Sequence, residues 1–486
     1  MKDICAFIED GRKYFVYGTA ILGNFCCEKI CEKLGDDAVI AYIESTPKNN
    51  QPDEGKEIIT PQEAISRSDD DNTYVIITGR ASAEEMRNNC LSAGFKDKNI
   101  LVVPKEIQEY LKVGYSYPLN RVCFWPPVNY CDDDLLKKID FYIPDRIEVK
   151  IFTKNPAVIG RLNHNVDICD ELDEDKIMED SDAIILWDVN REDNLFERYP
   201  NRVRIVDRYY WAHTDTLNYV RLYYDSFSKD EQRLMIEESK RKYLALQKEA
   251  KKYEKANIFC SGPSISEVYN VETNRFQDGF NIICNSMIKD KELMEKLRPN
   301  VLCFFDANFF HSPGKYGEAF YADLKETYEQ YKYYIFVRDI EYPLLVKHCP
   351  EMKEKIIGVP LKNANEYWFI EENNFSFRPL SNILTEIMVP LASAVCDKIY
   401  IAGCTGRGGE KNYFWKHNDR TQYMDLKKYV MEAWPAFFNY CRYDVYYNRH
   451  CQNVEEQLQY GESLGKKYVN ITTSHIPALI KRSEFV

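Results

Sequence analysis

Polar residues follow two apolar runs in the second half of the chain. Residues 258–260 form the first run, which leads into Ser261–Ser264, and residues 282–284 form the second, which leads into Asn285. Each run has the length and composition of a buried strand. The amide side chain of Asn285 can both donate and accept hydrogen bonds. Because ligands of parallel sheets bind at the carboxyl ends of the strands, we expect these polar residues to meet one ligand.

The turn Ser261–Ser264 has the composition of a phosphate-binding loop. Gly262 lets the backbone approach a ligand closely, and Pro263 suits the first turn of a helix. Ser264 and Glu267 have the spacing of a capping box, which satisfies two N–H groups at the start of a helix. The remaining N–H groups are expected to point outward and to bind a phosphate.

Four short motifs occur in one order in this region. They read SGPSISE from Ser261, ICN up to Asn285, LCFFD up to Asp306 and KIYIAG from Lys398. Their order and spacing resemble those of the bacterial sialyltransferases of glycosyltransferase family 42 and of the related motility-accessory-factor proteins that handle nonulosonic acids. The resemblance covers about a third of the chain, roughly residues 256–420. It implies inverting transfer of a sialic-acid-like sugar from a CMP donor to a hydroxyl of a surface glycan or glycoprotein, without a metal ion or other cofactor.

The resemblance also implies roles in donor binding. Asn285 matches a family residue that bonds the nucleotide, whereas Ser261 stands where the family has an Asn that precedes the Gly-Pro-Ser. Asp306 falls where the family often has Asn, and an acid there would take a ribose hydroxyl. Ser381 or Asn382 matches the small polar residue that opens the next helix, near the cytosine or the phosphate. The donor site expected from the turn and the resemblance therefore contains Ser261, Gly262, Ser264, Asn285, Asp306, Ser381 and Asn382.

A catalytic base is implied farther along the chain. His417 lies where the family carries its catalytic His, and a neutral imidazole can take the proton of the acceptor hydroxyl. Tyr413 would donate to the leaving phosphate, and Arg407 would balance its charge. Other residues of the same region are rivals for these roles: His311, His450 and His475 as the base, and Lys411 and Arg420 as the cation.

Two alternative functions stay open. Residues 306–308, Asp-Ala-Asn, follow a strand and loosely match the acidic motif of metal-dependent sugar transferases, in which a divalent ion holds a nucleoside diphosphate. The archaeal pterin pyrophosphokinases, which bind a metal nucleotide, resemble the region more distantly. The other alternative is a non-catalytic scaffold that binds nucleotide sugars, and the serine at position 261 favours it.

The last part of the chain alternates strands with helical patterns. Strands are predicted at 257–260, 281–284, 301–305, 333–337 and 398–402. This rhythm predicts an α/β domain with a parallel, Rossmann-like sheet of the sialyltransferase type over residues 256–486. A polar helix over residues 228–255, which starts at Ser228 and Glu231, is expected to link this domain to the preceding part of the chain.

The first part of the chain has the same rhythm. Residues 1–115 are predicted to form a Rossmann-like domain with a parallel sheet, and residues 116–227 a small α/β domain without a chemical motif. Gly18 and Gly23 are the ends of a degraded GxGxxG loop, and Glu44 lies near the position of a ribose-binding acid. A lone glycine pattern of this kind is a weak signal, and a scaffold is the preferred interpretation of the first domain.

Composition sets the cellular context. A net charge of −13 over 486 residues argues against nucleic acid as the main partner, because phosphate binding needs clustered Lys and Arg. The 16 Cys include no CxxC pair, which predicts buried, reduced thiols in a cytoplasmic protein. The first ten residues lack an apolar signal core, and no apolar stretch reaches membrane-spanning length. If the protein acts on lipid-linked or surface glycans, we expect it to do so from the inner side of the membrane or as a peripheral protein. Composition predicts no particular oligomeric state.

Overall fold

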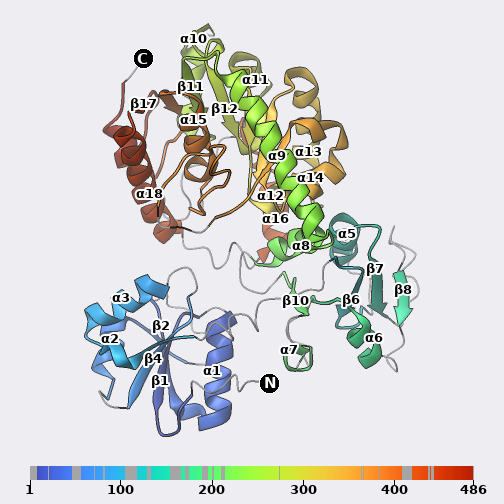
Figure 1. Ribbon diagram of the computed structural model, residues 1–486, viewed down its shortest axis with the longest axis vertical. Helices are drawn as coiled ribbons and strands as arrows, with labels where there is room; N and C mark the ends of the chain where they lie inside the picture. The colour runs from blue at the N-terminus through green and yellow to red at the C-terminus, as the bar shows by residue number, and fades with distance from the viewer. Residues whose placement is uncertain are drawn as a thin grey trace. The chain divides into compact units, whose positions relative to one another are not determined.

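The computed structural model is of the α/β class, as predicted, and contains three sheets (Figure 1). It describes residues 8–19, 21–45, 56–69, 72–79, 83–103, 118–128, 133–153, 166–169, 174–188, 195–199, 202–208, 214–272, 274–362, 364, 366–380, 382–407, 419–435, 438 and 443–484. The chain forms two compact units, one of residues 1–114 with 194–203 and one of residues 115–193 with 204–486. The finer domain boundaries given above stay predictions.

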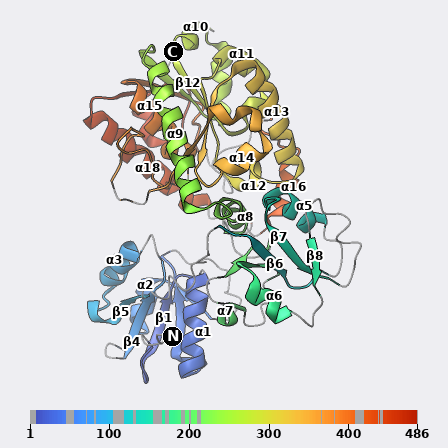
Figure 2. The ribbon, with the colours of Figure 1, turned by 45° about the vertical axis from the view of Figure 1, so that its right-hand side comes forward.

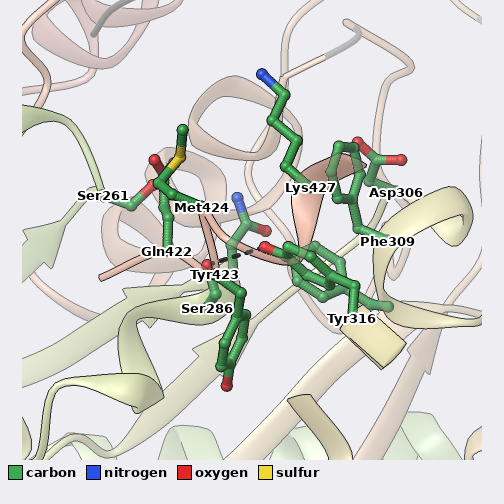
Figure 3. A pocket seen from close by; sticks show the side chains of 11 residues that line it. Ser261, Ser286, Asp306, Phe309, Tyr316, Gln422, Tyr423, Met424 and Lys427 are labelled. Carbon is green, nitrogen blue, oxygen red and sulfur yellow. Dashed lines mark hydrogen bonds between the residues drawn. The ribbon is translucent and has the colours of Figure 1, made fainter. Parts of the chain in front are cut away.

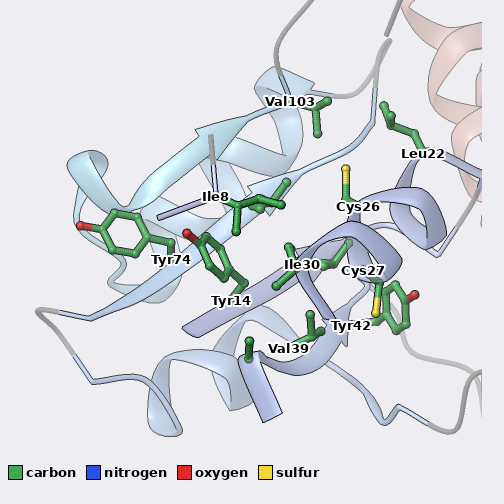
Figure 4. Packing of buried hydrophobic residues seen from close by; sticks show 13 residues of the cluster. Ile8, Tyr14, Leu22, Cys26, Cys27, Ile30, Val39, Tyr42, Tyr74 and Val103 are labelled. Atoms are coloured by element: carbon green, nitrogen blue, oxygen red, sulfur yellow. The ribbon is translucent and has the colours of Figure 1, made fainter. Parts of the chain in front are cut away.

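The N-terminal sheet has the strand order β3-β2-β1-β4-β5, and its strands are parallel. The strands are β1 (Lys13–Tyr17), β2 (Val39–Ile43), β3 (Ile58–Ile59), β4 (Thr73–Ile77) and β5 (Ile100–Val102). The helical elements are α1 (Ile21–Leu34), η1 (Asp36–Ala38), α2 (Pro61–Ser66), α3 (Ala83–Ala93) and η2 (Asp97–Asn99). Cys26, Cys27 and Ile30 of α1 are buried with Tyr14 and Val39 in one apolar cluster, so these two thiols are core residues (Figure 4).

The middle sheet has the order β10-β9-β6-β7-β8, which is the topology of the N-terminal sheet. In both sheets the first strand is central, the second and third lie on one side, and the fourth and fifth lie on the other. The strands are β6 (Arg121–Trp125), β7 (Glu148–Phe152), β8 (Val166–Cys169), β9 (Ala183–Leu186) and β10 (Val203–Ile205). The helices are α5 (Asp133–Tyr142), α6 (Glu174–Asp180), α7 (Leu195–Arg198) and α8 (Thr214–Asp225).

The long helix α9 (Lys229–Ala250) begins at the predicted capping box, with Ser228 and Glu231 bonded reciprocally. Its buried face packs against the C-terminal sheet, and both views show it lying along that sheet (Figures 1 and 2). Ser239 accepts a hydrogen bond from the N–H of Gly358 at 3.0 Å, and Lys242 donates to the carbonyl of Lys353. The helix is therefore part of the C-terminal layer as well as a connection to the preceding residues.

The C-terminal sheet has the order β15-β14-β13-β12-β11-β16-β17, with every pair parallel. Its strands are β11 (Lys255–Phe259), β12 (Phe280–Cys284), β13 (Val301–Cys303), β14 (Tyr334–Arg338), β15 (Ile356–Val359), β16 (Lys398–Ala402) and β17 (Lys467–Asn470). All five predicted strands are present, and the sequence prediction missed the two edge strands, β15 and β17. Since the strands are parallel, the ends of β11 to β14 lie along one edge of the sheet.

Helical elements connect these strands. They are η6 (Pro263–Asn270), α10 (Asn274–Gln277), η7 (Asn285–Lys289), α11 (Lys291–Leu297), α12 (Ala307–Phe310), α13 (Lys315–Tyr331), α14 (Tyr342–His348), η8 (Pro350–Lys355), the π-helix η9 (Leu384–Met388), α15 (Val389–Val395), α16 (Lys427–Ala433), α18 (Tyr443–Ser463) and α19 (Pro477–Ile480). Within the part of the chain that the structure describes, no helix is long and apolar enough to span a membrane.

Candidate functional site

Three neighbouring strands of the C-terminal sheet end at one pocket. Ser261 follows β11, Asn285 follows β12 and Asp306 follows β13, and all three line the same cavity. The other lining residues are Ser286, Phe309, Phe310, Tyr316, Gln422, Tyr423, Met424 and Lys427 (Figure 3). The structure thus brings together the polar residues that the sequence placed after separate strands.

The pocket is small. Its volume is about 100 Å³, whereas a pocket for a drug-sized ligand occupies roughly 300 to 1,000 Å³. A cavity of this size has room for one small group of a ligand, and the rest of a larger ligand would lie outside it.

The backbone is left-handed at two of the lining residues. Asn285 has a φ of 53° and Asp306 a φ of 69°. Asn and Asp tolerate this region better than other non-glycine residues, yet the conformation still costs roughly 1–3 kcal/mol per residue. Strained residues of this kind concentrate at binding and catalytic sites, so their position at the pocket is consistent with a functional role.

The turn after β11 differs from the expected phosphate cradle. The N–H of Gly262 donates to the carbonyl of Gly403 at 2.9 Å, and the N–H of Ser264 donates to Oγ1 of Thr405 at 2.8 Å. The next N–H, that of Ile265, donates to the carbonyl of Gly262. A cradle made of outward-pointing amides at Gly262 and Ser264 is therefore wrong, because the loop after β16 occupies these donors.

The predicted capping box at Ser264 and Glu267 is also wrong. Gly262 is the N-cap of η6, which has no side-chain cap. The hydroxyl of Ser264 lies 2.8 Å from Oγ1 of Thr405, and Glu267 accepts from the N–H of Thr473 at 3.0 Å. Both side chains join η6 to loops after β16 and β17, and neither lines the pocket.

One wall of the pocket comes from a distant segment that the sequence did not indicate. The hydroxyl of Ser286 donates to the carbonyl of Thr421 at 2.8 Å, and Lys289 Nζ donates to the carbonyl of Gln422 at 2.9 Å. Tyr316 in turn donates to Ser286 (Figure 3). These bonds attach the segment to η7, which places Lys427 at the pocket. Burial lowers the pKa of the Lys427 ammonium.

Asp306 has unusual electrostatics for an aspartate. Its side chain is exposed to solvent at the pocket, but densely packed protein surrounds it. The resulting desolvation raises the pKa of Asp306 to about 7, although the positive charge of Arg338 and the N–H of Asn308 act in the opposite direction.

Several other residues of the expected site are either not described or lie outside the pocket wall. His417, Tyr413, Lys411 and Ser381 lie outside the described residues. The guanidinium of Arg407 lies 5.8 Å from the ring of Tyr447, and Arg407 does not line the pocket. Asn382 caps the following helix, since its Oδ1 accepts from the N–H of Leu384 at 3.0 Å, and it too is absent from the pocket wall.

The structure describes four of the residues that were alternatives for the base and the cation. His311 and His450 are buried, and desolvation lowers the pKa of His311 to about 3 and that of His450 to about 4, so both are neutral and inaccessible. His475 is exposed, and its N–H donates to the carbonyl of Thr405. Arg420 forms ion pairs with Asp290 and Glu292, at 3.0 and 2.6 Å.

The described residues contain no group of three His, Cys, Asp or Glu side chains that could hold a metal ion. The acidic motif at residues 306–308 thus contributes one pocket carboxylate, that of Asp306, without partners for coordination.

No protein-family model, curated protein or solved structure matches the chain. The pocket presents a hydroxyl, a carboxamide, a carboxyl with a raised pKa and an ammonium group around a small volume.

Proposed function

We propose that the protein is an inverting glycosyltransferase that moves a sialic-acid-like sugar from CMP to a hydroxyl of a surface glycan or glycoprotein. The observation that carries the proposal is the convergence of Ser261, Asn285 and Asp306, which follow three adjacent parallel strands, on one pocket. Ligands of open parallel sheets bind at this edge. The family resemblance of the motifs around these residues supplies the chemistry.

The reaction has three requirements, and pocket residues suit two of them. Asn285 can bond the cytidine or its ribose, because its amide both donates and accepts. Lys427 can balance the charge of the donor phosphate, with the hydroxyl of Ser261 as a further contact. A base must then remove the acceptor proton, and the resemblance offers His417, with Tyr413 and Arg407 at the leaving phosphate.

The proposal includes the finer fold and the cellular location. The C-terminal domain would be a Rossmann-like domain of the sialyltransferase type, and the N-terminal domain a Rossmann-like scaffold. The enzyme would act in the cytoplasm, on the inner membrane surface where the acceptor is lipid-linked.

One observation favours an alternative. Because the turn amides after β11 bond the protein itself, the donor phosphate loses the contacts expected to hold it. A non-catalytic protein that binds nucleotide sugars would not need those contacts. Tight CMP binding without turnover of a CMP-sugar would support this alternative.

A thermal-shift series tests the proposal. CMP, CDP, UDP, GDP and NAD are each added with and without magnesium, since a ligand stabilises the native state in proportion to its occupancy. We expect CMP or CDP to raise the unfolding temperature independently of magnesium, and release of CMP from CMP-N-acetylneuraminate in the presence of glycans. A larger response to UDP with magnesium would instead support the metal-dependent transferase.

A further inference from the structure

We propose that Asp306 is the catalytic base of the pocket, with Arg338 as the residue that positions and tunes it. The inference deepens the proposed transferase function, on which it rests, and assigns the base to a residue other than His417. It is supported by the position of the carboxyl, by its fixed backbone and by the charges around it.

The carboxyl of Asp306 reaches the space where an acceptor would bind. It lines the pocket and is exposed there, on the side where Figure 3 also places Phe309 and Lys427, with Ser261 on the opposite side. A hydroxyl group held between these sides would contact Asp306 directly.

The backbone holds Asp306 in one conformation. Its φ of 69° is left-handed, and its carbonyl accepts the N–H groups of Phe309 and Phe310, each at 3.1 Å. A base must lie within hydrogen-bond distance of the proton that it removes, so a fixed backbone favours this role.

Charged groups on several elements face Asp306. Arg338, at the end of β14, is the centre of this group: its guanidinium lies 3.6 Å from Glu386 of η9 and 4.9 Å from the ring of Phe305. The N–H of Arg338 donates to Glu341, next to α14, at 3.0 Å. The positive charge of Arg338 therefore interacts with three carboxyl groups, those of Asp306, Glu341 and Glu386. Tyr316 of α13 and Lys427 of α16 line the same pocket as the carboxyl.

Asp306 differs from the other acids in this group because it reaches the ligand space. Glu341 and Glu386 are buried, at 0% and 2% exposure, and His311, which lies 3.9 Å from Glu341, is fully buried and neutral. Desolvation raises the pKa of Asp306 to about 7 against the opposing charge of Arg338. A base whose pKa lies near the working pH transfers protons most efficiently.

The proposed step is balanced. The O–H bond of the acceptor breaks, and its proton moves to a carboxylate oxygen of Asp306. The acceptor oxygen forms a bond to the anomeric carbon of the sugar while the bond from that carbon to the phosphate oxygen breaks, and the electron pair leaves with CMP. Asp306 then releases the proton to water.

The test compares Asp306→Asn with the wild type in two measurements: CMP binding by calorimetry and release of CMP from CMP-N-acetylneuraminate with glycan acceptors. Asn keeps the shape and tolerates positive φ. We expect kcat to fall by about 10² to 10⁴, with CMP affinity equal or higher because a negative charge is removed. The exposed variant Glu372→Gln serves as a matched control and should behave as the wild type.

Arg338 is tested through the pH dependence of the rate. Arg338→Gln removes the charge that lowers the pKa of Asp306, so the acidic limb of the kcat profile should move to higher pH. Arg338→Lys keeps the charge and should return the limb toward that of the wild type. Loss of packing alone would not move the limb, and circular dichroism checks that both variants fold.

The possible outcomes test the assignment of Asp306 as the base separately from the proposed transferase function. Wild-type turnover that survives in Asp306→Asn, with an unchanged acidic limb, overturns the assignment of Asp306 and leaves the transferase in place. Loss of turnover in His417→Ala together with such survival would make His417 the base. CMP binding without turnover in the wild type overturns the transferase and the base together.

Discussion

The loop after β1 and the turn after β11 each contain a glycine pattern, and in both the glycines make room for the protein itself. A Cβ on Gly18 would lie 2.6 Å from Thr78 Oγ1, and one on Gly23 would lie 2.0 Å from the carbonyl oxygen of Gly18. A Cβ on Gly262 would lie 2.4 Å from the carbonyl oxygen of Gly403. A glycine pattern predicts a close approach of two backbones, but it does not say whether the second group is a ligand.

The regions differ in what the neighbouring strands provide. Beside the first loop, Glu44 accepts a hydrogen bond from the hydroxyl of Thr19 at 2.7 Å, so this acid has a partner within the protein. Beside the second turn, Asn285 and Asp306 follow the two neighbouring strands, β12 and β13, and their side chains line the pocket. The candidate site therefore consists of the side chains next to the glycine turn, Asn285 and Asp306, and not of the turn itself.

The largest effect is expected from filling the glycine contacts. Gly262→Ala would force the added methyl group against the carbonyl of Gly403, and Gly23→Ala would do the same at Gly18. We expect each to lower the free energy of unfolding by about 3 kcal/mol. Urea unfolding followed by hydrogen exchange assigns each loss to its own unit.

Gly314→Ala is the matched control for these variants. Its φ is negative, and the nearest atom to an added Cβ is the hydroxyl of Ser312 at 3.8 Å. It should cost less than about 1 kcal/mol. An equal loss in all three variants would mean that the close contacts do not explain the glycines.

The next effect separates binding from stability at Asn285. Asn285→Gly relieves the positive φ and should preserve or slightly raise stability. The loss of the carboxamide should weaken CMP binding about 10-fold, the equivalent of one hydrogen bond to a partner of this kind. Calorimetry measures the affinity and thermal unfolding the stability. Equal CMP affinity in wild type and variant would remove Asn285 from the site.

A smaller effect is expected on the pH dependence of stability. The folded-state pKa of Asp306, about 7, lies above the value of about 4 for an unfolded aspartate. The folded protein then binds a proton that the unfolded chain has released, so this group lowers stability as the pH rises from 4 to 7. Asp306→Asn should therefore be more stable than the wild type at pH 8, with no gain at pH 4.

The size of this gain is limited by solvent. Because the carboxyl is exposed at the pocket, we expect less than about 1 kcal/mol. Urea unfolding at both pH values measures it, and Glu372→Gln should show no such dependence. A gain that is the same at pH 4 and pH 8 would show that Asp306 titrates normally.

The smallest effect is expected in the first loop. Glu44→Gln keeps an acceptor for Thr19, and such a neutral hydrogen bond contributes roughly 1 kcal/mol or less. We expect little change in stability and none in CMP affinity. A loss of CMP affinity in Glu44→Gln would shift the nucleotide site to the N-terminal sheet and reverse the comparison.

The buried strands and the row of polar residues after them could be predicted from sequence, because apolar runs and the residue that ends them are local signals. The strands predicted near residues 258, 282 and 301 are present, and Ser261, Asn285 and Asp306 meet at their ends. Strands β15 and β17 were missed, since four-residue edge strands have little pattern of their own.

The direction of the turn amides and the pocket wall around Gln422 could not be predicted. Both depend on contacts between distant parts of the chain. The amide of Gly262 meets Gly403, and Ser286 meets Thr421. No motif marks such pairs. The polar residue at the end of β14, Arg338, was also missed, although the rule that identified Asp306 applies to it equally.

A crystal structure of the protein soaked with CMP tests the central claim most directly. We predict electron density for the nucleotide at the ends of β11 to β13, in contact with Ser261 and Asn285. Density at the Gly18–Gly23 loop, with the C-terminal pocket empty in the same crystals, would contradict it.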